Sequence, residues 1–461
     1  MAKHPLSKRE EQHEVTRRAL IKWSVAAGAA LGVSRAKIFD ILERTAGKRT
    51  AEAASQNATH RSVHVVAGNG GLAWFLTFWP HPDVAAANNP TFATKTGMSS
   101  PIAGTDKPLT STPDTPWMSL PAARQVTAFQ AGQNQTHTLD PTSVETLNGN
   151  GIFAVASALQ STSPSVIPII TIGGQPIGTA PGGQTAAGVG SGDGIVGLFN
   201  SAASRAGGLL SNTSDAGLYK AHYAAFAQLN RAAKLSTQQA SYTTATGAAG
   251  FLGTNLAAQL AITASDLTRY GINSNTRSNV TDIAHALIVT VKAFKMGLTN
   301  SVVLPAMKDD PHGAWDQNDV ATVPGQLKGV FDAFMNDLTS TTDSVTGVTL
   351  ADDTVITFHG DTTKDPLNRT GWPDGTPMNS NVVFVYSANE LGSGWYGGTD
   401  RNGNVNGFDQ NGANVAYSGT NEAKFALAAI AFAIAKRDAR AISAFANGIT
   451  LGPALARPKN I

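Results

Sequence analysis

Residues 301–316, SVVLPAMKDDPHGAWD, join the pattern of a buried strand to a run of polar side chains. The apolar run at 302–304 ends at a proline, and two potential metal ligands, Asp310 and His312, follow a few residues later. In open α/β sheets, binding sites form outside the carboxyl ends of the strands. The stretch therefore predicts a parallel strand that delivers ligand-type side chains to the carboxyl edge of a sheet.

A second stretch repeats this arrangement further along the chain. Residues 354–358, TVITF, have the apolar and β-branched character of a strand. His359 and Asp361 follow it directly, and Asp374 lies a short distance beyond. Because the carboxyl ends of parallel strands meet at one edge of a sheet, we expect the two groups of side chains to approach one another.

The rest of the chain alternates between strand and helix patterns. Apolar runs predict further strands at 62–67, 166–172 and 382–386. Apolar composition and three- or four-residue spacing predict helices at 152–159, 281–296, 327–338 and 421–435. Strands and helices in alternation are typical of an α/β fold, in which a mostly parallel sheet is flanked by helices.

Other segments carry weaker patterns. We interpret residues 85–135 as loops and short helices, and 215–300 as mainly helical. The glycine-rich residues 173–197 contain neither a Walker loop nor a dinucleotide fingerprint in a strand–turn–helix context, so we interpret them as a flexible loop that covers a site.

In the helix expected at 281–296, Asp282 suits the positive N-terminal end and Gly297 suits the position of the C-terminal cap.

The composition excludes several classes of protein. Charged residues make up 14% of the chain, well below the usual quarter, and no basic patch indicates a nucleic-acid partner. There are no cysteines, so disulfides, thiolate metal sites and a cysteine nucleophile are excluded. A low charge content with abundant glycine and small polar residues is typical of an exported protein.

The N-terminal segment predicts the route of export. Residues 16–22, TRRALIK, match a twin-arginine signal, and a short Ala- and Gly-rich apolar stretch follows at 23–33. Residues 51–53, AEA, offer a cleavage site. We therefore expect a signal peptide over 1–53, followed by a single large α/β domain over 54–461 with loop and helical insertions. The export machinery is then a partner, and the location is bacterial, periplasmic or extracellular. No other segment is apolar enough to cross a membrane.

The two strand exits bring together side chains that suit a metal ion. The candidate metal ligands are Asp310, His312, Asp361 and Asp374, and His359 is the candidate catalytic residue. Carboxylates and imidazoles without thiols suit a divalent ion such as zinc, manganese or calcium. Such an ion polarises a phosphoryl or sulfuryl oxygen or activates water. The alternative is that both segments are charged surface turns, and spacing alone does not decide between the two.

Four motifs carry a resemblance to a known group of proteins. They are Asp310-Pro311-His312, residues 358–364 (FHGDTTK), Asp374-Gly375 and residues 396–400 (YGGTD). In this order they resemble the motifs of an uncharacterised bacterial twin-arginine-exported family related to the alkaline phosphatase/sulfatase superfamily. In that family the first motif reads Asp-Thr-His, the second motif reads Ser-Glu-Phe-Gly-Arg-Thr-Pro, and the third motif reads Asp-His. The resemblance covers roughly residues 275–400 and the leader. The Glu and Arg of the second motif are missing here, and Gly375 stands in place of the His.

The resemblance implies an alkaline phosphatase-like fold and a hydrolase of phosphate or sulfate esters with a reduced metal site. An unknown small molecule would be its substrate or ligand. The alternative is a non-catalytic periplasmic or surface protein that keeps the fold, which the missing ligands and nucleophile favour. A third hypothesis is a carbohydrate-binding protein with Trp315, Trp372 and Trp395 as stacking platforms.

Overall fold

The computed structural model describes residues 59–67, 78–86, 99–133, 146–163, 165–199, 255–306, 317–343, 347–360 and 377–458, with only the backbone at 317–321. The expected signal peptide at 1–53 lies outside these residues. The chain divides into two compact units. The smaller comprises 1–49, 164–166 and 194–261 and contains helix α9 (Leu256–Leu260). The larger comprises 50–163, 167–193 and 262–461, and it contains the sheet and both predicted strand exits.

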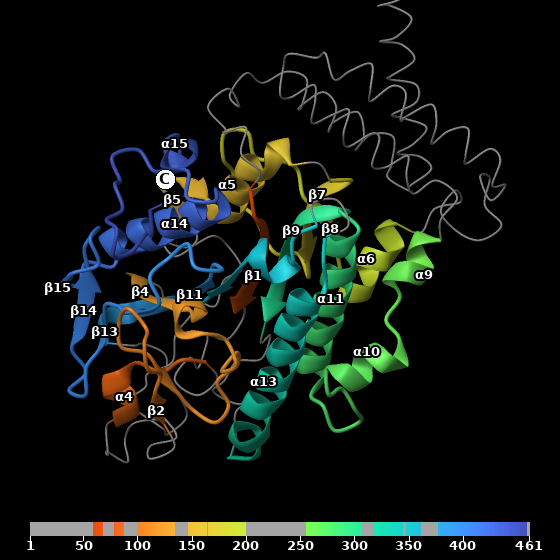
Figure 1. The fold of residues 1–461 in the computed structure, drawn as a ribbon, viewed down its shortest axis with the longest axis horizontal. Coiled ribbons are helices and arrows are strands. Elements are labelled where there is room, and N and C mark those ends of the chain that lie inside the picture. The colour runs from red at the N-terminus through yellow and green to blue at the C-terminus, as the bar shows by residue number, and fades with distance from the viewer. Residues whose placement is uncertain are drawn as a thin grey trace, which may run out of the picture. The chain divides into compact units, whose positions relative to one another are not determined.

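An eight-stranded sheet forms the centre of the larger unit (Figure 1). Across the sheet the strands are β8 (Ala187–Val189), β7 (Ile167–Ile172), β9 (Thr299–Ala306), β1 (Arg61–Ala67), β10 (Thr354–His359), β11 (Ser380–Tyr386), β4 (Thr127–Gln133) and β12 (Gly394–Tyr396). Only β11 runs against its two neighbours, and all the other pairings are parallel. The sheet is therefore mixed but mostly parallel, and the predicted α/β class is confirmed.

Helices cover both faces of this sheet. Side chains alternate between faces along a strand, so Val355 and Phe358 of β10 point to opposite sides. Val355 packs in a cluster with α5 (Ile152–Leu159) and α14 (Thr420–Ile434). Phe358 packs on the other side, where its ring lies 5.0 Å from that of Phe331 in α13 (Gln317–Ser340). The helix α11 (Ser278–Lys295) lies beside α13 (Figure 1).

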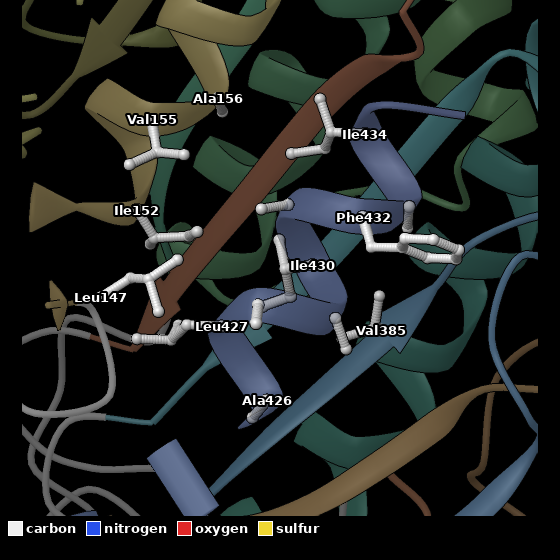
Figure 2. Close-up of a cluster of buried hydrophobic side chains, with 14 of the residues drawn as sticks. Leu147, Ile152, Val155, Ala156, Val385, Ala426, Leu427, Ile430, Phe432 and Ile434 are labelled. Atoms are coloured by element: carbon white, nitrogen blue, oxygen red, sulfur yellow. The ribbon is translucent and has the colours of Figure 1, made fainter. Parts of the chain in front are cut away.

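The cluster under α14 is built from small and branched side chains. Figure 2 shows Ile152 and Val155 of α5 on one side and Leu427 and Ile430 of α14 on the other, with Val385 of the sheet nearby. All five are buried completely or nearly so. The many alanines of α14 let the helix lie close to the sheet. Because most of its residues are buried, its sequence is nearly all apolar.

Most strands and helices predicted from the sequence are present, and three expectations are wrong. Residues 85–135 are not only loops and short helices, because they contain β4, a strand near one side of the sheet. Residues 173–197 are not one loop: β8 and the helix α6 (Gly192–Leu198) lie there, and Gly190 and Ser191 join this strand to this helix. The helix α11 begins at Ser278, so Asp282 is not in its first turn.

Other expectations about this region are confirmed. Gly297 adopts a left-handed conformation (φ 66°) two residues after the end of α11, and the amide of Leu298 donates to the carbonyl of Ala293, as a C-terminal cap requires. The described residues between 255 and 300 are mainly helical. Over the stretches that the structure describes, none of the helices has both the length and the apolar character needed to cross a bilayer.

Candidate functional site

Three adjacent strands of the sheet end at the same level. In the registers of β1 with its two neighbours, Val66 lies opposite His359 of β10 on one side and Pro305 of β9 on the other. The segments 307–316 and 361–376 follow β9 and β10 directly, so both leave the sheet at its carboxyl edge with only β1 between them. Topology thus brings the two predicted strand exits together, at the edge where α/β proteins build their sites.

The structure describes one of the five predicted site residues. Asp310, His312, Asp361 and Asp374 lie outside the described residues. Within the described part of the chain, no group of three or more His, Asp or Glu side chains is arranged to hold a metal ion. The carboxylate oxygens and imidazole nitrogens in the sequence of the two strand exits are the kinds of donor atom that bind a divalent ion such as zinc.

His359 is the last residue of β10 and its side chain is completely buried. Its Nε2 lies 2.7 Å from Oγ1 of Thr357, and the same oxygen lies 2.7 Å from Nδ1 of His64 on β1. A hydroxyl group has one proton to donate, so Thr357 donates to one imidazole and accepts from the other. The three side chains therefore form one hydrogen-bonded unit that fixes the ring of His359.

His64 is a member of this unit that the sequence analysis did not single out. Complete burial, with a smaller contribution from the neighbouring His359, lowers the pKa of His64 well below its usual value, so the ring stays neutral. The ring of Phe153 on α5 lies 4.8 Å from that of His64 and 5.1 Å from that of His359, which separates both from solvent. A histidine inside the otherwise apolar strand pattern at 62–67 was the available signal.

The peptide after His359 is also fixed. Asn381 of β11 is completely buried, and its Nδ2 donates to the carbonyl oxygen of Gly360 at 2.9 Å. Its Oδ1 accepts from the amide of Val382 at 2.8 Å. The carbonyl group of Gly360 is therefore held in place by the sheet.

A second group of histidine and carboxylate side chains lies at the opposite, amino edge of the sheet. The ring of His60 contacts Asp353 and Glu390, each at 3.2 Å. Arg61 pairs with Asp353 at 2.8 Å and also with Asp343. Each of these three carboxylates contacts the imidazole of His60 or the guanidinium of Arg61, so we interpret this group as structural.

Two other predicted features are structural as well. Trp395 is only 4% exposed, and its indole nitrogen donates to the carbonyl of Trp79, so it is not an exposed stacking platform. Trp315 and Trp372 lie outside the described residues. In the motif at 396–400, Asp400 caps a hairpin turn by accepting from the amides of Asn402 and Asn404, each at 2.8 Å. This carboxylate therefore has a structural role in the turn.

Comparison of the chain with models of protein families gave no match, and neither did a search of curated proteins.

Proposed function

We propose that this protein is an exported member of the alkaline phosphatase-like fold with a reduced metal site that hydrolyses phosphate or sulfate esters. The observation that carries the proposal is the topology of the sheet, which places the exits of β9 and β10 on either side of β1 at one carboxyl edge. The motif at 310–312 lies in the segment that follows β9. The motif at 358–364 begins at the end of β10 and continues into the segment that follows it. Export by the twin-arginine route rests on the leader sequence at 16–22.

Each candidate residue has a role in this proposal. Asp310, His312 and Asp374 would hold the ion, and Asp361 would act as a further ligand or orient one. When bound, the ion polarises the ester oxygen or activates the attacking water. His359 would be a ligand or the general acid, and its hydrogen bond to Thr357 sets the orientation of its ring.

A non-catalytic protein with the same fold is the second candidate. Its support is the complete burial of His359 beneath Phe153, together with the motif residues missing at Gly375 and in 358–364. A fold does not by itself carry an activity. In that case the edge of the sheet would serve binding or structure without hydrolysis.

Metal analysis separates the two candidates. The protein would be purified after export, without chelator or affinity metal, and its metal content measured with that of Asp310→Ala and His312→Ala. We expect stoichiometric zinc, manganese or calcium in the wild type and its loss in both variants, with unfolding of the metal-free proteins unchanged. Asp409→Ala, in the turn between β14 (Val405–Phe408) and β15 (Asn414–Ala416), is the matched control.

The outcomes lead to different next steps. Bound metal that depends on Asp310 and His312 justifies a screen of phosphate and sulfate esters. A folded wild-type protein that contains no metal, and takes up none when it is added, overturns the hydrolase proposal and leaves the non-catalytic one.

A further inference from the structure

A pocket of ≈ 70 Å³ lies at the carboxyl edge of the sheet, on the β9 side of the two strand exits. Its lining residues come from the ends of β7 and β9, the turn after β8, the first residue of α6 and the first half of α11: Ile172, Gly190, Ser191, Gly192, Asn279, Asp282, Ala286, Leu304 and Pro305. One water molecule needs roughly 10–15 Å³ of such a volume, so the pocket has room for about five water molecules or one small organic group.

The walls of this pocket are held by close packing of glycines. A Cβ atom on Gly192 would lie 2.5 Å from the amide nitrogen of Ala286, so only glycine lets this turn rest on the backbone of α11. On the other side, Gly173 has a positive φ of 66° and packs against the ring of Pro305. The hydrogen bond between Asp193 of α6 and His285 of α11, at 3.1 Å, adds a further link at this wall. The pocket is therefore preformed.

Gly190 differs from these glycines. Its φ is not positive, and a Cβ atom there would have no atom within 4 Å. Neither backbone conformation nor packing requires glycine at this position. Gly190 is an exposed residue of the pocket lining, so a large side chain there would occupy open space next to the pocket. Glycine leaves that space free.

The polar groups of the lining select the kind of ligand. Among the lining residues that the structure describes, Asp282 is the one that is charged, and the side chains of Ser191 and Asn279 are neutral. A carboxylate repels phosphate or sulfate and accepts hydrogen bonds from hydroxyl groups. The amide of Asn279 can donate and accept, and Leu304, Ile172 and Ala286 provide apolar surface.

We propose that this pocket binds a neutral polyhydroxylated group the size of a small sugar or cyclitol. Asp282 accepts hydrogen bonds from its hydroxyls, Ser191 and Asn279 complete the polar contacts, and the apolar lining meets its carbon skeleton. Pro305 lies one residue before the end of β9, which leads directly to the segment with Asp310 and His312. The group would therefore be the alcohol part of the ester, an assignment that rests on the proposed function, whereas the binding itself does not.

The test is a binding titration of the metal-free full chain by calorimetry and ligand-observed NMR. The neutral probes are glucose, galactose, myo-inositol and glycerol. Inorganic phosphate, an anion, and ethanolamine, a cation, are titrated in the same way for comparison. We expect at least one polyol to bind in preference to phosphate and ethanolamine. Gly190→Leu should abolish this binding, and Asp282→Asn should weaken it by about 10- to 100-fold, because a hydrogen bond to a charged group is lost.

Two variants serve as matched controls. Gly329 on α13 is also exposed and also has open space at its Cβ position, so Gly329→Leu should leave binding unchanged. Asn275→Ala removes an exposed polar side chain from the turn before α11, outside the pocket, and it should also have no effect.

Each remaining outcome overturns the inference. Absence of polyol binding, preference for phosphate or ethanolamine, or equal binding by wild type and Gly190→Leu would each do so. Since no metal or ester is present, polyol binding in a protein that never binds metal would leave this inference standing while the hydrolase proposal falls. Metal binding without polyol binding would give the reverse result.

Discussion

Gly360 follows His359 at the end of β10, and its lack of a side chain lets Asn381 reach its carbonyl oxygen. A Cβ atom on Gly360 would lie 2.1 Å from Oδ1 of Asn381 and 3.3 Å from the carbonyl oxygen of Val382. We expect Gly360→Ala to displace the Asn381 amide and break its two buried hydrogen bonds, to Gly360 and Val382. The expected loss in free energy of unfolding is about 2–4 kcal/mol, measured by urea denaturation.

Gly188→Ala is the control for this change. Gly188 lies in β8, and a Cβ atom there would have one neighbour, Oγ1 of Thr171, at an ordinary contact distance of 3.6 Å. This variant should be neutral or slightly stabilising, because alanine loses less backbone entropy than glycine on folding. Equal stability of the two variants would show that Asn381 does not depend on the space at Gly360.

At this scale the sequence placed His359 directly after the strand predicted at 354–358, which ends one residue before the observed end of β10, but it did not predict which side chains contact it. His359 was predicted from its place directly after an apolar run, which is a local pattern. Its link to His64 runs through Thr357, and the contact between Thr357 and His64 joins positions 293 residues apart in the chain. Nothing in a local pattern encodes such a distant pair, so His64 was missed.

At the scale of elements, strong local patterns predicted structure and weak ones did not. The predicted helix at 152–159 coincides with α5, and the apolar strand at 382–386 lies within β11. The strand β4, with the sequence TAFQAGQ, was missed because Gln130 and Gly132 interrupt its apolar character. Gln130 is nevertheless completely buried, and its side-chain amide donates to the hydroxyl of Ser380 at 2.7 Å. A tertiary hydrogen bond compensates for the polar residue there.

The amino end of β1 gives a pH-dependent prediction. Burial alone would lower the pKa of His60, but its hydrogen bonds to Asp353 and Glu390 outweigh this effect and raise the pKa above 6.5. A pKa that is higher in the folded than in the unfolded protein stabilises the fold below the unfolded value and loses this contribution as pH rises through the folded value. We therefore expect His60→Gln to reduce the free energy of unfolding more at pH 5.5 than at pH 8.5.

Urea denaturation at the two pH values measures this difference. The control is Thr59→Val, which removes the neighbouring hydrogen bond to Ser163 without removing a titrating group, so its effect should be the same at both pH values. A larger loss for His60→Gln at pH 8.5 than at pH 5.5 would contradict the assignment of a raised pKa.

At the scale of the whole larger unit, the two edges of the sheet carry different kinds of polar residue. The amino edge contains the paired charges around Arg61 and Asp353, while the carboxyl edge gives rise to the segments 307–316 and 361–376. The sequence predicted a parallel sheet and its carboxyl edge, since these follow from alternating elements. It did not predict which strands are neighbours, because pairing joins segments far apart in the chain, as with β1 and β10.

This division leads to a prediction about two variants at opposite edges. Arg61 is 8% exposed and pairs with Asp343 and Asp353, which are 1% and 5% exposed. We expect Arg61→Leu to lower the free energy of unfolding by about 3–5 kcal/mol, because two buried carboxylates lose the guanidinium group that both of them contact. Metal content per folded molecule should not change, since the candidate ligands follow the other ends of the strands. Asp310→Ala should do the opposite, losing metal while the metal-free protein unfolds at the same urea concentration.

Both quantities can be measured on the same samples, by elemental analysis of the folded fraction and by urea denaturation in the presence of chelator. Arg61→Lys keeps the charge but not the forked geometry of the guanidinium group, so it should be folded and intermediate in stability even if Arg61→Leu is not. If the folded Arg61→Lys protein lost metal in proportion to its loss of stability, the two edges would be coupled. The site would then depend on the whole sheet, and the separation of a stabilising amino edge from a functional carboxyl edge would be wrong.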